Sequence, residues 1–267
     1  MKNKLVIVTG ASSGIGRACA VKFAQMGANI VLAARSEVKL EEVATEIAKY
    51  GVEVLVIATD VSKEQDCKKL IESTLERFGK IDVLINNAGI SMRAAFSDLD
   101  VDVFKKVMAV NFWGAVYCTH YAIASILKNK GSVVGISSIA GYKGLPGRTG
   151  YSSSKFAMHG FLEALRIENM KKGLHVLIAC PGFTASNIRN SALSGDGSSQ
   201  GETPRDEQKM MQPEEVAAYI VDAVVKRKDR LTLTFSGKLT VLLNKFFPKL
   251  VDKLIYNHMS KEPNSPF

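Results

Sequence analysis

Thr9-Gly10-Ala11-Ser12-Ser13-Gly14-Ile15-Gly16 is the stretch of sequence that decides the fold. A β-branched apolar run, Leu5 to Val8, comes directly before it, and a helix-like pattern continues after it to Met26. Glycines at such a turn allow the backbone to approach a pyrophosphate group at the N-terminus of the helix. An ordinary tight turn would also be rich in glycine, but a second apolar strand, Asn29 to Ala34, follows at the distance expected of a β-α-β unit. The stretch therefore indicates a dinucleotide-binding unit.

Predicted helices and strands continue to alternate downstream of this unit. The expected helices are 37–50, 63–78, one or two within 98–128, and 213–228, and the expected strands are 52–58, 81–85, 131–136, 174–179 and 231–235. Apolar strands that alternate with helices are typical of a parallel sheet covered on both faces. We therefore expect an α/β fold: a single Rossmann-type, doubly wound domain with a parallel sheet of about seven strands flanked by helices. This catalytic domain would span 1–236, with 237–267 as a C-terminal helical extension.

The composition suits one large globular domain of 267 residues, with 46% hydrophobic and 23% charged residues. The formal charge of +9 is concentrated near the C-terminus, which argues against a general nucleic-acid footprint. Four scattered cysteines lack C-x-x-C spacing, so we interpret them as reduced core residues and expect no metal site. The chain begins without the apolar region of a signal peptide and has no apolar run of transmembrane length. The expected location is the cytoplasm.

The residue that closes the second strand bears on the choice of cofactor. Enzymes of this fold that use NAD place an acidic side chain there for the ribose hydroxyl, whereas an arginine can bind a 2′-phosphate. The segment here is Ala33-Ala34-Arg35-Ser36, without an acid. Arg35 therefore favours NADP(H). The alternative is that Arg35 is a solvated charge at the end of a strand, without a role in cofactor binding.

Tyr151-Ser152-Ser153-Ser154-Lys155 is the candidate catalytic stretch. On a helix, its four-residue spacing makes the Tyr151 and Lys155 side chains neighbours. A nearby positive charge favours the phenolate and so lowers the pKa of a tyrosine toward a range useful for proton transfer. Asn111 lies in an apolar stretch, where a buried amide requires partners, and it is either a structural hydrogen bonder or the holder of a catalytic water.

Together these motifs resemble those of the short-chain dehydrogenase/reductase family, in its form of roughly 250 residues. The glycine stretch matches the family's TGxxxGxG turn, Asn86-Asn87-Ala88-Gly89 its NNAG motif, and Tyr151 to Lys155 its YxxxK motif. Ser138 precedes Tyr151 by the family's usual interval, and Pro181-Gly182 matches its PG turn. The motifs occur in the family's order across residues 5–184, about two-thirds of the chain.

The resemblance implies a catalytic set of Asn111, Ser138, Tyr151 and Lys155. Tyr151 would protonate the carbonyl oxygen during reduction, and Lys155 would lower the pKa of Tyr151 and bind the nicotinamide ribose. Ser138, rather than the adjacent Ser137, would hydrogen-bond the substrate oxygen, and Asn111 would support a proton relay through water. Two hydroxyl donors aimed at the oxygen where negative charge develops lower the barrier to hydride transfer.

Together with Arg35, the resemblance implies a cofactor site in which Asp60 contacts the adenine, Asn87 the adenosine ribose region and Thr184 the nicotinamide carboxamide. The expected cofactor-binding residues are Gly10, Ser12, Ser13, Gly14, Ile15, Gly16, Arg35, Asp60, Val61, Asn87, Ala88, Gly89, Tyr151, Lys155, Pro181, Gly182 and Thr184. The expected function is NADP(H)-dependent interconversion of a carbonyl and a secondary alcohol. The alternatives are an NAD-dependent dehydrogenase of the same fold and a scaffold that senses the cofactor without turnover.

Two regions depart from the family's common pattern. The expected substrate loop, about 185–212, does not identify the substrate, and its polar part from Ser191 to Arg205 has the composition of a mobile lid. The tail from Gly237 to Met259 carries Leu and Phe residues at helical spacing beside a lysine stripe, and Pro248 suggests two short helices.

This tail has two open interpretations: it packs over the substrate site or at a subunit contact, or it rests on a membrane surface and receives an apolar substrate there. The tail is loosely similar to those of family members that act on lipids, retinoids or steroids. The resemblance also implies a homodimer or homotetramer formed through the long helices that contain Asn111 and Tyr151.

Overall fold

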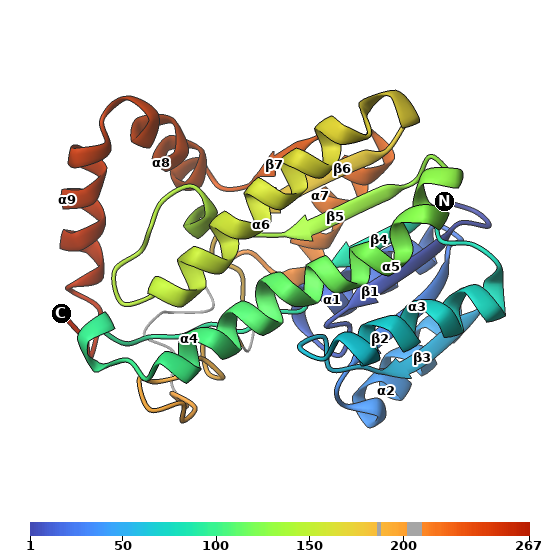
Figure 1. The fold of residues 1–267 in the computed structure, drawn as a ribbon, viewed down its shortest axis with the longest axis horizontal. Coiled ribbons are helices and arrows are strands. Elements are labelled where there is room, and N and C mark those ends of the chain that lie inside the picture. Colours follow the sequence, from blue (N-terminus) through green and yellow to red (C-terminus); the bar gives the residue numbers. More distant parts are fainter. Residues whose placement is uncertain (186–187, 202–209) are drawn as a thin grey trace.

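The protein is described by a computed structural model that covers residues 1–185, 188–201 and 210–267. Within these residues seven parallel strands form one sheet, in the order β3-β2-β1-β4-β5-β6-β7 (Figure 1). The strands are β1 (Leu5–Thr9), β2 (Asn29–Ala34), β3 (Val54–Ala58), β4 (Val83–Asn86), β5 (Ser132–Ile136), β6 (His175–Cys180) and β7 (Arg230–Thr232). The predicted doubly wound sheet is therefore confirmed, and the strand order reverses between β1 and β4.

Helices cover both faces of the sheet, as Figure 1 shows. One apolar core lies under α1 (Gly14–Gln25), α2 (Glu37–Ala48) and α7 (Pro213–Val225), and a second lies under α3 (Glu64–Phe78), α5 (Gly114–Lys128) and α6 (Thr149–Glu168). Every residue of β1, β4, β5 and β6 is buried. Burial on both faces explains why these strands are continuous apolar runs rather than alternating patterns. All four cysteines are buried, as expected of core residues.

The expected helical segment within 98–128 consists of α4 (Val101–Met108) and α5, joined by a π-helical turn from Ala109 to Trp113. A π turn inserts an extra residue into the helical ladder and is frequent at functional sites. Asn111 lies inside this turn and is fully buried.

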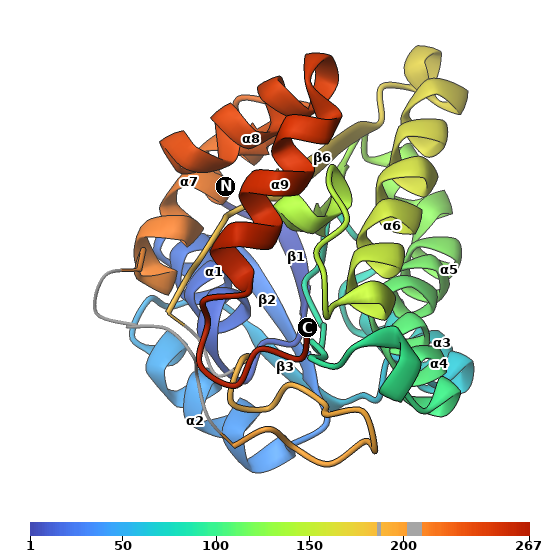
Figure 2. The ribbon, with the colours of Figure 1, turned by 90° about the vertical axis from the view of Figure 1, so that its left-hand side faces the viewer.

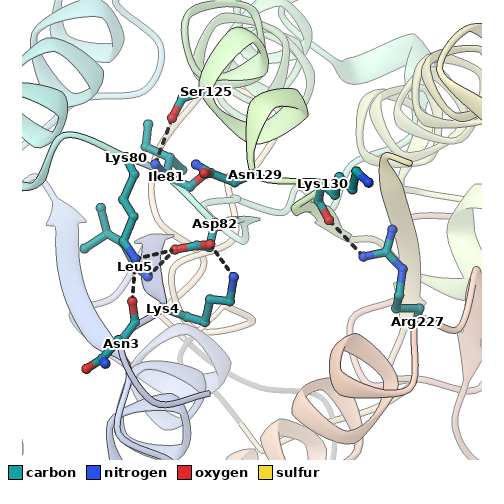
Figure 3. A network of polar contacts seen from close by, with 10 residues as sticks. All are labelled: Asn3, Lys4, Leu5, Lys80, Ile81, Asp82, Ser125, Asn129, Lys130 and Arg227. Atoms are coloured by element: carbon teal, nitrogen blue, oxygen red, sulfur yellow. Dashed lines mark hydrogen bonds and ion pairs between the residues drawn. The ribbon is translucent and has the colours of Figure 1, made fainter. Parts of the chain in front are cut away.

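A buried carboxylate joins the amino ends of β1 and β4, at the edge of the sheet opposite the strands' carboxyl ends (Figure 3). Asp82 accepts hydrogen bonds from the Leu5 amide at 2.9 Å and from the Lys4 ammonium at 2.8 Å. Lys80 lies 3.6 Å from the same carboxylate and donates to the Asn3 carbonyl. These contacts fix the start of both central strands and leave the opposite edge for a ligand.

The tail forms two helices, α8 (Phe235–Phe246) and α9 (Pro248–Met259), with Pro248 in the first turn of the second, as predicted. The predicted last strand, 231–235, is wrong at its end because Thr234 turns the chain with φ +58° and caps α8 through the Gly237 amide. Figure 2 shows both helices in front of the carboxyl ends of the strands. Among the helices of the described ranges, none combines the length and apolar character that crossing a bilayer requires.

Candidate active site

The turn between β1 and α1 has the geometry of an anion cradle. Gly10 and Gly14 adopt φ values of +66° and +53°, which favour glycine. A Cβ on Gly16 would overlap the Gly10 carbonyl, so the turn and the helix approach too closely for a side chain there. Within the described residues, the Ser13 side chain makes no capping hydrogen bond to the first turn of α1. The amides of the first helical turn are therefore suited to a pyrophosphate.

The NNAG segment after β4 supports this turn. The Asn87 side chain donates to the carbonyls of Thr9 at 2.9 Å and Gly10 at 3.2 Å. The Thr9 hydroxyl in turn accepts from the amides of Asn87 and Ala88. The predicted contact of Asn87 with the adenosine ribose is not tested, and the structure adds a second role, since its amide fixes the glycine turn. Thr9 is a site residue that the sequence analysis missed.

The carboxyl ends of β2 and β3 bring Arg35 and Asp60 together at one end of the expected site. These strands pair so that Ala34 lies opposite Ala58, and Arg35 is exposed directly after this pair. Burial raises the pKa of Asp60, but hydrogen bonds from Ser62 and the Arg35 charge outweigh it and leave the pKa below its usual value. An exposed guanidinium at this strand end can bind an anionic group, and the carboxylate can accept hydrogen bonds.

The structure brings Ser138, Tyr151 and Lys155 together at the carboxyl end of β5. The Lys155 ammonium lies 5.6 Å from the centroid of the Tyr151 ring, and the Ser138 hydroxyl is near enough to the Tyr151 hydroxyl to lower its pKa. The neighbouring Ser137 hydroxyl lies 2.7 Å from Nε2 of His159. Ser138 therefore lies beside Tyr151 and Ser137 beside His159, and the role of Ser138 toward the substrate oxygen stays a prediction.

The electrostatics of Tyr151 differ from the sequence-based expectation of a lowered pKa. Partial burial raises the pKa of Tyr151, and the Ser138 hydroxyl and the charges of Arg148 and Arg189 offset this only in part. Burial also lowers the pKa of Lys155 to about 8, because the charged ammonium loses its hydration. Tyr151 is therefore held as the neutral phenol, the form that can donate a proton.

Asn111 makes structural hydrogen bonds through both its side-chain oxygen and its side-chain nitrogen. Its side-chain oxygen accepts from the Ile90 amide at 2.8 Å, and its nitrogen donates to the Ile90 carbonyl at 2.9 Å and the Ser154 hydroxyl at 3.0 Å. Ser154 donates to the Tyr151 carbonyl at 2.7 Å, so Asn111 connects the segment after β4 to the catalytic helix. The first alternative for Asn111 is thus observed, and its part in a water relay stays a prediction.

Two further residues near the site follow from helical spacing that the sequence analysis did not use. His159 lies one turn after Lys155, is buried, and contacts Ser137 and, at 3.8 Å, the Cys180 sulfur. Arg148 lies directly before α6, three positions before Tyr151, and its charge acts on the phenol. Both positions could have been found by extending i, i+3 and i, i+4 spacing from Tyr151 and Lys155.

The segment after β6 carries the remaining predicted cofactor residues. Gly182 adopts φ +81°, and Thr184 is buried and accepts from the Arg189 side chain at 2.9 Å through its carbonyl. The predicted lid, 191–205, lies partly outside the described residues. In its described part, Leu193 is buried and pairs with Ser91 and Arg93 through backbone hydrogen bonds. The lid function itself stays a prediction.

Comparisons with known proteins identify the family of this chain. The family described as short chain dehydrogenase matches residues 4–196. The mouse protein Dehydrogenase/reductase SDR family member 7B is 36% identical over 99% of this chain and 84% of its own length. The peanut (Arachis hypogaea) protein 11-beta-hydroxysteroid dehydrogenase A is 35% identical over 98% of this chain and 78% of its own length.

Two solved structures have the same fold. An alcohol dehydrogenase from Thermococcus sibiricus, complexed with 5-hydroxy-NADP, has a TM-score of 0.75 at 28% identity, covering 86% of this chain and 94% of that one. A short chain dehydrogenase/reductase from Burkholderia phymatum, in complex with NAD, has a TM-score of 0.83 at 24% identity, covering 93% and 95%.

Proposed function

The chain belongs to the short-chain dehydrogenase/reductase family and is an oxidoreductase, and we propose that it interconverts a carbonyl and a secondary alcohol with NADP(H) as cofactor. The observation that carries this proposal is the meeting of Ser138, Tyr151 and Lys155 at the sheet edge that also holds the glycine turn. Ligands of open α/β sheets bind at this edge, where the strand order reverses.

Each proposed role follows from where the residue lies. The bound nicotinamide supplies the hydride that converts the carbonyl carbon to an alcohol carbon. The neutral Tyr151 hydroxyl donates its proton to the carbonyl oxygen, and the Ser138 hydroxyl donates a hydrogen bond to that oxygen. Lys155 would bind the ribose hydroxyls from its buried position beneath Tyr151. Gly10, Ser12 to Gly16, Asp60, Val61, Asn87 to Gly89 and Pro181 to Thr184 would hold the rest of the cofactor.

Arg35 supports NADP(H) over NAD(H). It is exposed at the carboxyl end of β2, where no acidic side chain follows the strand. A guanidinium can bind a 2′-phosphate through two parallel hydrogen bonds, whereas an NAD-specific site needs an acceptor for the ribose hydroxyl. The enzyme alternative is therefore an NAD-dependent dehydrogenase, which differs from this proposal at Arg35.

We propose an apolar substrate of lipid, steroid or retinoid type, delivered at a membrane surface. Phe235, Leu242 and Phe246 on α8, and Phe247 between α8 and α9, are each more than half exposed. Exposed lysines on α8 and α9 would attract anionic lipid. They are Lys238 and Lys245 on α8, and Lys249 and Lys253 on α9. The name of the peanut relative points to the same substrate class. We further propose that the enzyme is cytoplasmic and makes this peripheral membrane contact. We also propose that it forms a homodimer or homotetramer through α5 and α6.

Turnover and cofactor binding test the reaction directly. NADPH and NADH are titrated separately into the purified protein while tryptophan and nicotinamide fluorescence is recorded, and a carbonyl panel then follows with the tighter cofactor. We expect NADPH to bind more tightly and to be oxidised by long-chain or polycyclic carbonyls. Tyr151→Phe removes only the donor hydroxyl and should abolish turnover while cofactor binding remains. Surviving activity in that variant would contradict the mechanism. Cofactor binding without turnover in the unmodified protein would favour the cofactor-sensing scaffold.

Vesicle cosedimentation tests the membrane contact separately. The full-length protein should bind vesicles that contain phosphatidylserine, and Phe246→Ser with Leu250→Ser should reduce binding. The control is Val38→Ser, which removes an exposed apolar side chain from α2 on another part of the surface. Equal, negligible binding of all three proteins would exclude the membrane contact and leave the reaction untouched.

A further inference from the structure

Residues 260–267, which follow α9, carry a buried acid. The Glu262 carboxylate lies 3.5 Å from the Arg93 guanidinium and 3.7 Å from the Arg148 guanidinium. All three side chains are almost excluded from solvent, with exposed fractions of 7%, 8% and 12% for Glu262, Arg93 and Arg148. Arg93 also donates to the Pro263 carbonyl at 2.7 Å. The contact is therefore a buried charge cluster rather than a surface ion pair.

The cluster joins three segments that are distant in the sequence. Arg93 lies after β4 and contacts the expected substrate loop, because its backbone amide donates a hydrogen bond of 2.8 Å to the Leu193 carbonyl. Arg148 ends the segment that begins at Ser138 and leads into the helix of Tyr151. The Ala94 amide donates to the Gly147 carbonyl at 3.0 Å, which ties the two arginine-bearing segments together.

The end of the described chain packs directly against this junction. A Cβ on Gly147 would lie 3.0 Å from Pro266 and 3.2 Å from Phe267, so these residues already touch the glycine closely. In Figure 2 the C-terminus lies in front of the carboxyl ends of the strands, between the two helix layers. Residues 260–267 therefore cover the segment that connects Ser138 to Tyr151.

Elsewhere, two polar contacts also attach the tail to this segment. Asn244 of α8 donates to the Tyr142 carbonyl at 3.1 Å, and Asp252 of α9 lies 2.6 Å from the Lys143 ammonium. A groove of about 670 Å³ remains between α9 and the start of α6. In the ion pair between Lys143 and Asp252, the Asp252 side chain is exposed to solvent. Within the described residues, the Glu262 cluster is therefore the charge contact of the tail that is buried.

Removing one partner of a buried ion pair is costly because it leaves the other charge without compensation. Loss of the Glu262 carboxylate would remove the negative charge that Arg93 and Arg148 share. Arg148 also acts on Tyr151, as do Arg189, the Ser138 hydroxyl and the Cys180 thiol, while the Lys155 ammonium lies under the ring. Glu262 therefore influences the charge around the phenol through Arg148.

We propose that Glu262 is a positioning residue of the active site. Its carboxylate fastens residues 260–267 over the segment between Ser138 and Tyr151. Through Arg148 it also limits the positive charge beside the Tyr151 hydroxyl. The second role rests on the proposed function, because it presumes that Tyr151 is the proton donor, whereas the first role does not.

The test compares full-length Glu262→Gln with Asp252→Asn. Both variants remove one carboxylate from the tail, but Asp252 is largely exposed. Hydrogen exchange reports the fastening without any turnover. We expect Glu262→Gln to raise amide exchange in 260–267 and 143–150 by about tenfold or more, equivalent to about 1.4 kcal/mol. Asp252→Asn should leave exchange in 260–267 near that of the unmodified protein.

The pH profile of carbonyl reduction reports the electrostatic role. Without the Glu262 carboxylate, Arg148 favours the phenolate more strongly, so the pKa of Tyr151 falls. The alkaline limb of kcat should then move to lower pH in Glu262→Gln and stay in place in Asp252→Asn. A purely structural role would lower kcat without moving this limb. Glu262→Asp keeps the charge on a shorter side chain and should restore the limb while exchange remains partly raised.

Unchanged exchange in Glu262→Gln would overturn the fastening, and raised exchange with an unmoved limb would overturn the electrostatic role. If Glu262→Gln does not fold, Glu262→Asp decides the fastening, since amide exchange in 260–267 equal to that of the unmodified protein would refute it. Absence of turnover in the unmodified protein would overturn the proposed function and the electrostatic role together. Hydrogen exchange would still decide whether the tail is fastened.

Discussion

The Lys155 ammonium donates a hydrogen bond of 2.9 Å to the carbonyl of Ile136, two residues before Ser138. This contact anchors the catalytic helix to the end of β5 from within the core, where Lys155 is 4% exposed. A buried ammonium is destabilising even when it has one carbonyl partner. The fold therefore maintains a costly group where the proposed chemistry requires it.

Lys155→Met should stabilise the cofactor-free protein at neutral pH while abolishing turnover. Burial lowers the pKa of Lys155 from its usual 10.5 to about 8, and this shift corresponds to about 3 kcal/mol of destabilisation. The unpaired Ile136 carbonyl offsets about 1 kcal/mol or more of the gain. We expect a net gain of about 1–2 kcal/mol at pH 7 in urea denaturation.

The size of this effect changes with pH in a defined window. Below pH 8 Lys155 is charged in both the folded and unfolded states, so the penalty is complete. As pH rises from about 8 to 10.5, the folded protein loses this proton first and the penalty disappears. The advantage of Lys155→Met should therefore shrink across this window. Lys171→Met, at an exposed lysine, is the control, and a pH-independent advantage would contradict the burial argument.

Sequence patterns predicted the sheet well because its strands are buried on both faces. β2 was predicted with its observed bounds, since Asn29 to Ala34 is a continuous apolar run between glycine and arginine. The end of β7 was missed because the positive φ of Thr234, which starts α8, has no sequence signal in a non-glycine residue.

For the site, motif spacing predicted that Ser138, Tyr151 and Lys155 would meet, but not how the tail would contact them. Glu262 reaches Arg93 and Arg148 only through the folded path of α8 and α9, and charge composition alone does not pair such distant residues. The raised pKa of Tyr151 was missed for a related reason, because the degree of burial depends on the assembled site.

Arg35→Ser should weaken NADPH use far more than NADH use. The exposed guanidinium would bind the 2′-phosphate that NADH lacks, so the Michaelis constant for NADPH should rise by about tenfold or more while that for NADH changes little. Steady-state kinetics with both cofactors give this comparison. Arg77→Ser is the matched control, since Arg77 is an exposed arginine near the opposite end of the neighbouring helix α3. Equal changes for both cofactors would refute the assignment of Arg35.

His159→Gln should make the protein less sensitive to acid. Burial first, and then the charges of Arg230 and Lys155, lower the pKa of His159 from its usual 6.5 to about 4. The unfolded chain therefore binds a proton that the folded chain resists, and stability falls as pH drops from 6.5 to 4. Glutamine can still contact the Ser137 hydroxyl but does not titrate.

Denaturation at several pH values in this window measures the effect. The difference between the unmodified protein and His159→Gln should widen in favour of the variant as pH falls. His120→Gln is the matched control because His120 is exposed on α5. A constant difference from pH 7 to pH 4 would show that His159 is not held neutral by the fold.

Asp82→Ala should destabilise the protein without altering cofactor binding. The Asp82 side chain is 4% exposed and holds the Leu5 amide and the Lys4 ammonium, as Figure 3 shows. Alanine would leave the buried amide without its acceptor, at a cost of about 2–3 kcal/mol. Chemical denaturation should show this loss, whereas the control Asp102→Ala, which breaks an exposed ion pair with Lys105, should show no measurable change.

The location of Asp82 makes the kinetic part of this prediction specific. It lies between the amino ends of β1 and β4, whereas the glycine turn and the NNAG segment lie at the carboxyl ends of the same two strands. The Michaelis constant for NADPH in Asp82→Ala should therefore equal that of the unmodified protein under conditions where both are folded. A selective rise in that constant would mean that the paired strands transmit a change at one end to the other, because β1 and β4 carry the two halves of the cradle.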